Sequence, residues 1–132
     1  MSNGMVVVDT SVWVEFFNRP GSLHHTRIDE LLDLDRVAIT GVIAAELIRG
    51  CREARERSRV ETALEGVKHL ELPFESWLTA GREMFDLRRK GVTVSLSDAS
   101  IATACRASGA LLYTLDHDFD RFADLARYGE AA

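Results

Sequence analysis

Short, continuous apolar runs alternate along this chain with longer segments of helical periodicity. Met5–Val8 and Leu111–Thr114 are the clearest of the short runs, and each ends near an aspartate. Val37–Ile39 and His69–Leu72 are weaker candidates of the same kind. A strand that is apolar along its whole length is typical of a parallel sheet that is covered on both faces. We therefore expect a mainly parallel sheet.

The segments between these runs carry the signals of helices. The predicted helices are Val12–Phe17, His24–Leu32, Gly41–Arg49, Arg52–Leu64, Phe74–Arg89, Ser97–Ser108 and Phe119–Ala126. Thr40 and Ser97 are suitable N-cap residues, and Gly91 and Gly109 suit the position that follows a helix. Strands that alternate with helices imply βαβ units. The predicted fold class is α/β, a three-layer α/β/α sandwich.

The chain of 132 residues is the length of one domain, which can bury a core without the help of disulfides. Cys51 and Cys105 are its only cysteines and form no CxxC pair, which argues for a reducing compartment and against a structural zinc site. The apolar start is too short for a signal peptide or a membrane span. We expect one cytoplasmic domain over residues 1–132, with a disordered start at 1–4 and a tail at 127–132.

The formal net charge of −5 opposes the simplest form of nucleic-acid binding, in which a basic surface holds the phosphates. Five arginines lie close together between Arg49 and Arg59, where they could grip RNA or a protein partner. Glutamates at positions 53, 56 and 61 interleave with them, which favours a solvent-exposed helix instead. Nucleic-acid chemistry would therefore need another source of positive charge.

Four acidic residues fall where the predicted topology brings distant parts of the chain together. Asp9 follows the first strand and Asp116 follows the last, and ligands of open α/β sheets bind at the carboxyl ends of the strands. Glu46 and Asp98 lie early in helices that open onto the same edge. The neighbours of Glu46 are apolar, and a carboxylate in such a place is costly unless it is paired or metal-bound. We expect the four carboxylates to converge.

Converging carboxylates repel one another, by about 4 kcal/mol for each pair at ~4 Å and an effective dielectric constant of ~20. A divalent cation would offset this cost. Carboxylate ligands without histidine or thiolate favour hard ions such as Mg²⁺ or Mn²⁺. Such ions bind phosphate oxygens and ready a water for attack. The metal would then supply the positive charge that phosphate chemistry needs and the surface lacks.

Four motifs, in this order, resemble those of PIN-domain proteins. They are Val6-Val-Val-Asp9-Thr10-Ser11-Val12-Trp13, Ala45-Glu46, Leu96-Ser97-Asp98-Ala99 and Thr114-Leu115-Asp116-His117-Asp118-Phe119. The resemblance spans Met5 to Phe122, and the chain length matches the VapC toxins of bacterial and archaeal toxin–antitoxin pairs. The order and spacing of the motifs are specific, whereas a single short motif would not be.

The resemblance implies an Mg²⁺- or Mn²⁺-dependent endoribonuclease that inhibits translation by cutting structured RNA, namely tRNA or rRNA. By motif, it implies that the metal-binding catalytic acids are Asp9, Glu46, Asp98 and Asp116, with Ser11 as a polar helper and Asp118 as a further candidate ligand. It also implies a twofold homodimer, for which Trp77, Leu78 and Phe85 offer apolar surface. The implied partner is a VapB-type antitoxin, through which alone the toxin would reach operator DNA.

Each acid also has a purely structural interpretation. Asp9 and Asp116 can end strands in turns, and Asp118 can cap a helix. Glu46 can be a solvated helix residue, and Asp98 can complement the dipole of its helix. The motifs around these acids favour a functional role, and they do so least for Asp118.

Other functions remain open at this point. A haloacid-dehalogenase-like phosphatase would use Asp9 as a nucleophile, but it would have a second aspartate where Ser11 stands. A receiver-type signalling module would place two acids beside the first strand, where Val6–Ser11 offers one. A dinucleotide-binding domain is disfavoured because no GxGxxG motif follows that strand. A non-catalytic module that only binds RNA or protein stays possible.

Overall fold

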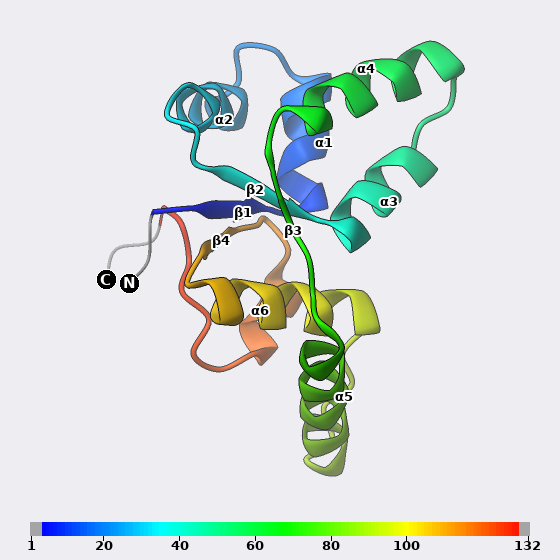
Figure 1. The fold of residues 1–132 in the computed structure, drawn as a ribbon, viewed down its shortest axis with the longest axis vertical. Helices are drawn as coiled ribbons and strands as arrows, with labels where there is room; N and C mark the ends of the chain where they lie inside the picture. Colours follow the sequence, from blue (N-terminus) through cyan, green and yellow to red (C-terminus); the bar gives the residue numbers. More distant parts are fainter. Residues whose placement is uncertain (1–3, 130–132) are drawn as a thin grey trace.

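Four short strands form one parallel sheet in the computed structural model, which describes residues 4–129 (Figure 1). The strands are β1 (Val6–Val8), β2 (Val37–Thr40), β3 (Lys68–Leu70) and β4 (Leu111–Tyr113). Their order in the sheet is β3-β2-β1-β4, with Val6 of β1 paired with Val37 on one side and Leu111 on the other. The predictions of four strands and of a parallel sheet are confirmed.

Helices cover both faces of this sheet, as predicted for a three-layer sandwich. The helices are α1 (Thr10–Asn18), α2 (Leu23–Asp33), α3 (Gly41–Arg49), α4 (Ala54–Glu65), α5 (Phe74–Arg89) and α6 (Leu96–Ser108), followed by a 3₁₀ helix η1 (His117–Arg121). In Figure 1, α1, α2 and α4 lie above the sheet, and α5 and α6 lie below it. α3 follows β2 and contacts α1, α4 and α6.

The helices that connect the strands change from one face of the sheet to the other next to β1. The chain passes from β1 to β2 through α1 and α2, and from β2 to β3 through α3 and α4. It then returns to β4 through α5 and α6, on the opposite face (Figure 1). β1 and β4 are therefore neighbours whose adjoining helices lie on opposite faces of the sheet. In open α/β sheets, the crevice beyond the carboxyl ends of such a strand pair is where ligands bind.

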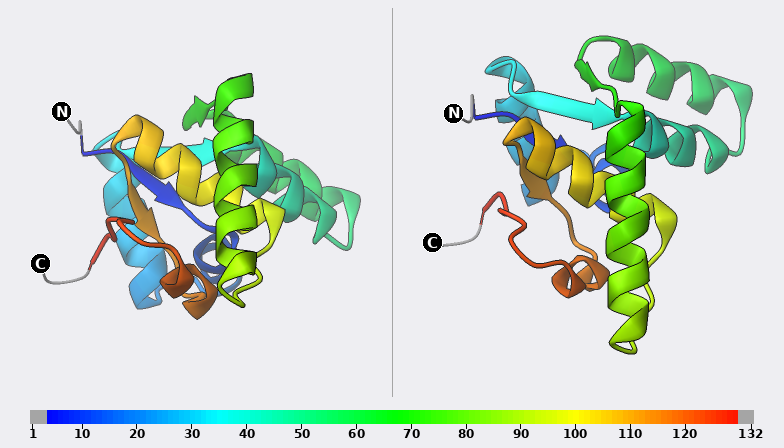
Figure 2. Two further views of the ribbon diagram at one scale, coloured as in Figure 1. Left: turned by 90° about the horizontal axis from the view of Figure 1, so that it is seen from below. Right: turned by 60° about the horizontal axis from the view of Figure 1, so that its bottom comes forward.

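The core lies around the central strand. Val6, Val7 and Val8 are fully buried, and Trp13 of α1, which has no exposed surface, belongs to the same hydrophobic core. The other tryptophan, Trp77, is 37% exposed, and Phe85 is 49% exposed. Both lie on α5, which packs across α6 and extends beyond the body of the molecule (Figure 2). These two aromatic residues are therefore surface residues and not part of the core.

The helix ends follow the predicted signals with one exception. Thr40 caps α3 by accepting a hydrogen bond from the Ile43 amide at 3.3 Å, as expected. Gly109 ends α6 in the left-handed conformation, with φ of +73°. The cap of α6, however, is Ser95 and not Ser97: its Oγ accepts from the Asp98 amide at 3.0 Å. Two serines in one short segment both satisfy the capping pattern, and Ser97 has another partner in the structure.

The predicted last helix, Phe119–Ala126, is wrong. The chain forms the 3₁₀ helix η1, in which Asp116 caps the first turn by accepting from the Asp118 amide at 2.9 Å. Phe119 and Phe122, three residues apart, are both buried, which suits the three-residue turn of a 3₁₀ helix. The chain then runs alongside β4, where Leu112 pairs with Arg127.

The expected start and tail are described only in part. Residues 1–3 and 130–132 lie outside the described residues. Gly4 accepts a hydrogen bond from the Arg36 side chain at 2.5 Å, and the Tyr128 amide donates to the Leu112 carbonyl at 2.9 Å. The described end of the expected tail is therefore held against the sheet.

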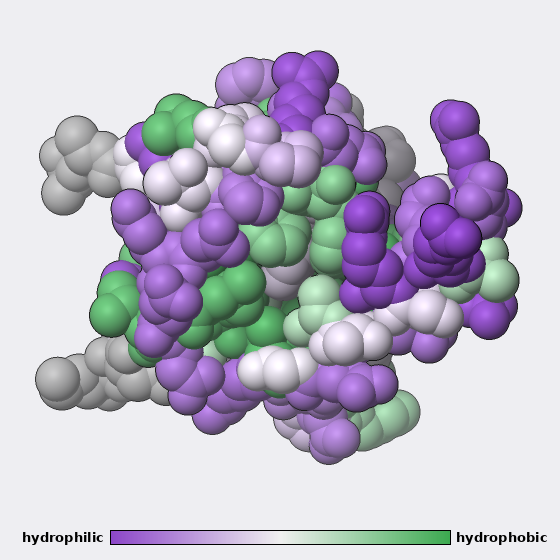
Figure 3. Space-filling model, turned by 90° about the horizontal axis from the view of Figure 1, so that it is seen from above, coloured by the Kyte–Doolittle hydropathy of each residue, from purple (hydrophilic) through white to green (hydrophobic). Residues whose placement is uncertain are grey.

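The surface is mixed in polarity. On the face that carries α2 and α4, hydrophobic residues lie in a recess between hydrophilic ones (Figure 3). Within residues 4–129, every helix is too short or too polar to cross a membrane.

Candidate active site

Asp9 stands at the carboxyl end of β1, where the chain turns into α1. Its amide donates to the Tyr113 carbonyl of β4 at 2.9 Å, so the end of the sheet fixes its backbone. The side chain is only 6% exposed. Its Oδ2 atom accepts hydrogen bonds from Ser11 Oγ at 2.9 Å and from Thr114 Oγ1 at 2.8 Å. The two hydroxyls satisfy a buried carboxylate oxygen that would otherwise be costly to desolvate.

The same two hydroxyls connect α1 to the segment that follows β4. Ser11 Oγ accepts from the Leu115 amide at 3.0 Å, and Thr114 Oγ1 accepts from the Asp116 amide at 3.0 Å. Ser11 and Thr114 also lie 3.4 Å apart, oxygen to oxygen. The position of Asp116 therefore depends on the contacts that hold Asp9.

Three aspartates form the tightest acidic group among the described residues. Asp98, Asp116 and Asp118 each offer a carboxylate oxygen, and these oxygens all lie within 4.8 Å of one another. Asp98 comes from the first turn of α6, and the other two come from the start of η1. The sequence motifs gave Asp118 the weakest case for function, yet its carboxylate belongs to this group.

The charges in this group affect one another. The pKa of Asp98 is raised to about 6, mainly by burial and also by the negative charges of Asp116, Asp9 and Asp118, while the hydrogen bond with Ser95 acts to lower it. Asp9 is thus close enough to Asp98 for its charge to act on it, although it is not in the tightest group. Repulsion of this kind is what a bound cation would relieve.

Hydrogen bonds from two hydroxyl groups connect Glu46 to this site. It lies in the second turn of α3, where Oε1 accepts from Thr10 Oγ1 at 3.0 Å and Oε2 accepts from Ser97 Oγ at 3.4 Å. Thr10 follows Asp9 in sequence, and Ser97 precedes Asp98. Glu46 therefore lies between the two segments that carry these aspartates, and the structure places all four predicted acids at one edge of the sheet.

The donor set fits a hard divalent cation. The clustered side chains offer only carboxylate oxygens, which are the ligands that Mg²⁺ and Mn²⁺ prefer. Burial is the main cause of the raised pKa of Asp98, and the negative charges of Asp116, Asp9 and Asp118 add to it, so a bound cation would stabilise the ionised form. Asp9, Asp98, Asp116 and Asp118 are the residues that could hold such an ion, with Glu46 at the margin.

The sequence patterns do not predict a role in this site for three hydroxyl residues that belong to it. Thr10 and Thr114 lie in the motifs without a predicted role, and Ser97 is predicted to be a helix cap. Each lies within two positions of one of the predicted acids. A hydroxyl beside an acid at the end of a strand is a weak signal, because such residues also cap helices and form turns.

Comparison with known proteins identifies the family to which this arrangement belongs. The sequence model of the PIN-domain family matches residues 6–125 of this chain. The chain belongs to the PIN-domain family. This PIN domain is 30% identical to a VapC ribonuclease of Mycobacterium bovis, over 97% of this chain and 98% of the relative. It has the same identity and coverage with Ribonuclease VapC11 of Mycobacterium tuberculosis.

Solved structures also resemble this PIN domain. VapBC2 from Rickettsia felis, bound to a DNA fragment from its promoter, matches with a TM-score of 0.80 at 20% identity, over 94% of this chain and 97% of the other. VapBC-5 from Mycobacterium tuberculosis matches with a TM-score of 0.62 at 26% identity, over 93% and 94% of the two chains. The resemblance that the sequence motifs indicated is confirmed.

Proposed function

We propose that this PIN domain is an endoribonuclease, the toxin of a VapBC-type pair, which inhibits translation by cutting structured RNA such as tRNA or rRNA. The proposal rests on the group of carboxylates beyond β1 and β4, where ligands of such sheets bind. It is supported by relatives named VapC ribonucleases that match over nearly the whole chain.

The metal is part of the same proposal. Asp9, Glu46, Asp98 and Asp116 would hold Mg²⁺ or Mn²⁺, with Asp118 as a further ligand. When bound, such an ion neutralises phosphate oxygens and lowers the pKa of a water that can attack phosphorus.

The chain's own hydroxyl groups position these acids. Ser11 and Thr114 orient the carboxylate of Asp9, while Thr10 and Ser97 orient that of Glu46. Loss of an orienting hydrogen bond of this kind commonly lowers metal affinity or activity about 10- to 100-fold. Ser11 would also stand close to the bound phosphate, as a polar helper.

A protein partner follows from the toxin assignment. We propose a VapB-type antitoxin with a basic segment, because a Lys or Arg side chain placed among the carboxylates would take the position of the metal. Operator DNA would be bound only through that antitoxin, and the pair would act in the cytoplasm. A homodimer would form through apolar surface such as that of α5, where Trp77, Leu78 and Phe85 are exposed.

The test is cleavage of structured RNA by the purified protein. We expect cleavage of tRNA or rRNA with Mg²⁺ or Mn²⁺ and none after the metal is chelated. Asp98→Asn should keep the fold and lose at least ~10²-fold in rate, because it removes a metal ligand. Asp86→Asn is the control, since it changes an exposed acid of α5 outside the acidic group. Full activity in chelator would contradict the metal mechanism.

A further inference from the structure

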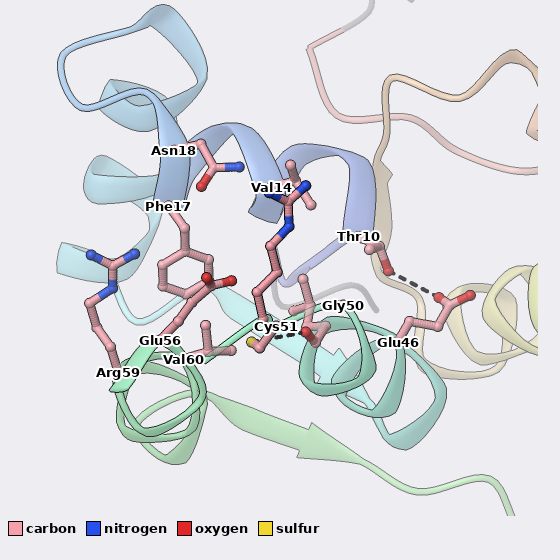
Figure 4. A pocket seen from close by; sticks show the side chains of 12 residues that line it. Thr10, Val14, Phe17, Asn18, Glu46, Gly50, Cys51, Glu56, Arg59 and Val60 are labelled. Atoms are coloured by element: carbon pink, nitrogen blue, oxygen red, sulfur yellow. Dashed lines mark hydrogen bonds between the residues drawn. The ribbon is translucent and has the colours of Figure 1, made fainter. Parts of the chain in front are cut away.

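A cavity of about 400 Å³ lies beside the acidic site, between α1, α3 and α4 (Figure 4). Thr10 and Glu46 line one end of it, and these two residues also belong to the hydrogen-bond network of the acids. From there the cavity follows α1 as far as Asn18. With a rise of about 1.5 Å per residue, that is a distance of roughly 12 Å along the helix.

The end of the cavity distant from the acids combines a flat apolar surface with polar groups. Phe17 of α1 and Arg59 of α4 lie together there (Figure 4), with the guanidinium carbon 5.9 Å from the ring centroid. Val14 and Val60 extend the apolar lining. Aromatic rings and guanidinium planes are the surfaces on which proteins stack unpaired bases of RNA.

Polar groups that can pair with a base line the same space. The Asn18 amide offers two donors and one acceptor, and the Glu56 carboxylate offers acceptors. Base edges carry donors and acceptors in fixed patterns with which these two side chains can pair, whereas an apolar side chain of a peptide offers them no partner. This chemistry favours a nucleotide over an apolar peptide anchor.

The charges of the lining also permit a phosphate. Arg52 and Arg59 offset Glu46 and Glu56, so the lining carries no formal net charge. The whole chain, in contrast, has a formal net charge of −5. The cavity is therefore a place beside the acids where an RNA backbone can approach without net repulsion.

We propose that this cavity binds one unpaired nucleotide of the RNA substrate, close to the phosphodiester that is cut. Its base stacks on Phe17 and Arg59 and is distinguished by Asn18 and Glu56, while Arg52 faces the backbone. The inference rests on the proposed ribonuclease function and adds a subsite that selects where the RNA is cut.

The binding experiment uses an RNA hairpin with a randomised loop and the Asp98→Asn protein, so that cleavage does not interfere. Phe17→Leu in this background should weaken binding about tenfold, because an aliphatic side chain cannot stack on a base. Phe74→Leu, which changes an exposed aromatic residue at the start of α5, is the matched control and should leave binding unchanged.

The cleavage experiment uses proteins with intact acids and the sequences of the cut sites. Wild type should prefer certain bases at one position near the cut, and Asn18→Ala should relax that preference while retaining cleavage. Asn18 is exposed at the end of α1, so this variant is expected to fold even if Phe17→Leu does not. Thr79→Ala, at an exposed position of α5, is the control and should leave the preference unchanged.

Two results would overturn the inference. One is unchanged binding in Phe17→Leu together with an unchanged base preference in Asn18→Ala. The other is RNA cleavage at an unchanged rate and with an unchanged base preference by both variants, combined with escape from the antitoxin, which would assign the cavity to the protein partner. Absence of cleavage by wild type would instead contradict the ribonuclease function, and the binding comparison in Asp98→Asn would still decide the role of the cavity.

Discussion

Asp98 is the residue whose ionisation the structure changes most clearly within the site. Burial, with the charges of neighbouring aspartates, raises its pKa to about 6, compared with about 3.9 for an unfolded chain. An acid of this kind binds more protons in the folded state. The metal-free protein should therefore lose stability as pH rises from about 4 to about 6 and change little above that range.

This dependence gives a prediction for Asp98→Asn. The variant cannot titrate at this position, so its metal-free stability should vary less between pH 4 and pH 6. At pH 7 it should be the more stable protein, by about 1 kcal/mol after allowance for solvent screening of a partly exposed side chain. Urea unfolding at several pH values measures this. Parallel curves for the variant and the wild type would show that the charges of the site do not repel as inferred.

Thr114 allows a test of positioning without removing an acid. Thr114→Val keeps the shape of the side chain but removes the hydrogen bond to Asp9 and the acceptor for the Asp116 amide. We expect metal affinity or the cleavage rate to fall about 10-fold or more. Thr79→Val, on the exposed part of α5, serves as the control and should retain full activity. Equal activity of the two variants would show that Ser11 alone positions Asp9.

Two neighbouring serines at the start of α6 have different roles, one in helix capping and one in the acidic site. Ser95 caps the helix, whereas Ser97 Oγ donates to Glu46 at 3.4 Å. Ser95→Ala should therefore cost about 1 kcal/mol in unfolding free energy. Ser97→Ala should leave stability nearly unchanged and lower the cleavage rate. Urea unfolding and cleavage assays on both variants test this, and the reverse pattern would mean that the cap was assigned correctly from the sequence.

Most of the secondary-structure elements could be predicted from the sequence, but η1 could not. The four strands and the helices before η1 follow from local patterns of apolar residues, and the ends of the strands place Asp9 and Asp116 correctly. η1 could not be predicted in this way, because its short turns depend on the burial of Phe119 and Phe122 against the rest of the fold. The position of Asp118 depends on η1. The partners of Glu46 likewise depend on how α1, α3 and α6 pack, and no local pattern contains that information.

For the whole molecule, the exposed aromatic residues of α5 bear on assembly. If α5 forms the proposed homodimer, Trp77→Ser with Phe85→Ser should shift the protein from dimer to monomer in analytical ultracentrifugation at micromolar concentration. Both side chains are partly exposed in the isolated chain, so the variant should still fold. A wild-type protein that sediments only as a monomer would contradict the homodimer, and an unchanged dimer in the variant would place the interface elsewhere.

We propose above that the acids at the carboxyl ends of β1 and β4 bind a divalent metal. Calorimetric titration of Mn²⁺ into the purified protein, without RNA, measures this most directly. Wild type and Asp86→Asn should bind Mn²⁺ with the same affinity, and Asp98→Asn should bind at least about 10-fold more weakly. Mn²⁺ should also raise the melting temperature of wild type and of Asp86→Asn, because the ion binds only the folded state. Equal Mn²⁺ affinity in all three proteins, or no binding to wild type, would contradict the assignment of these carboxylates as a metal site.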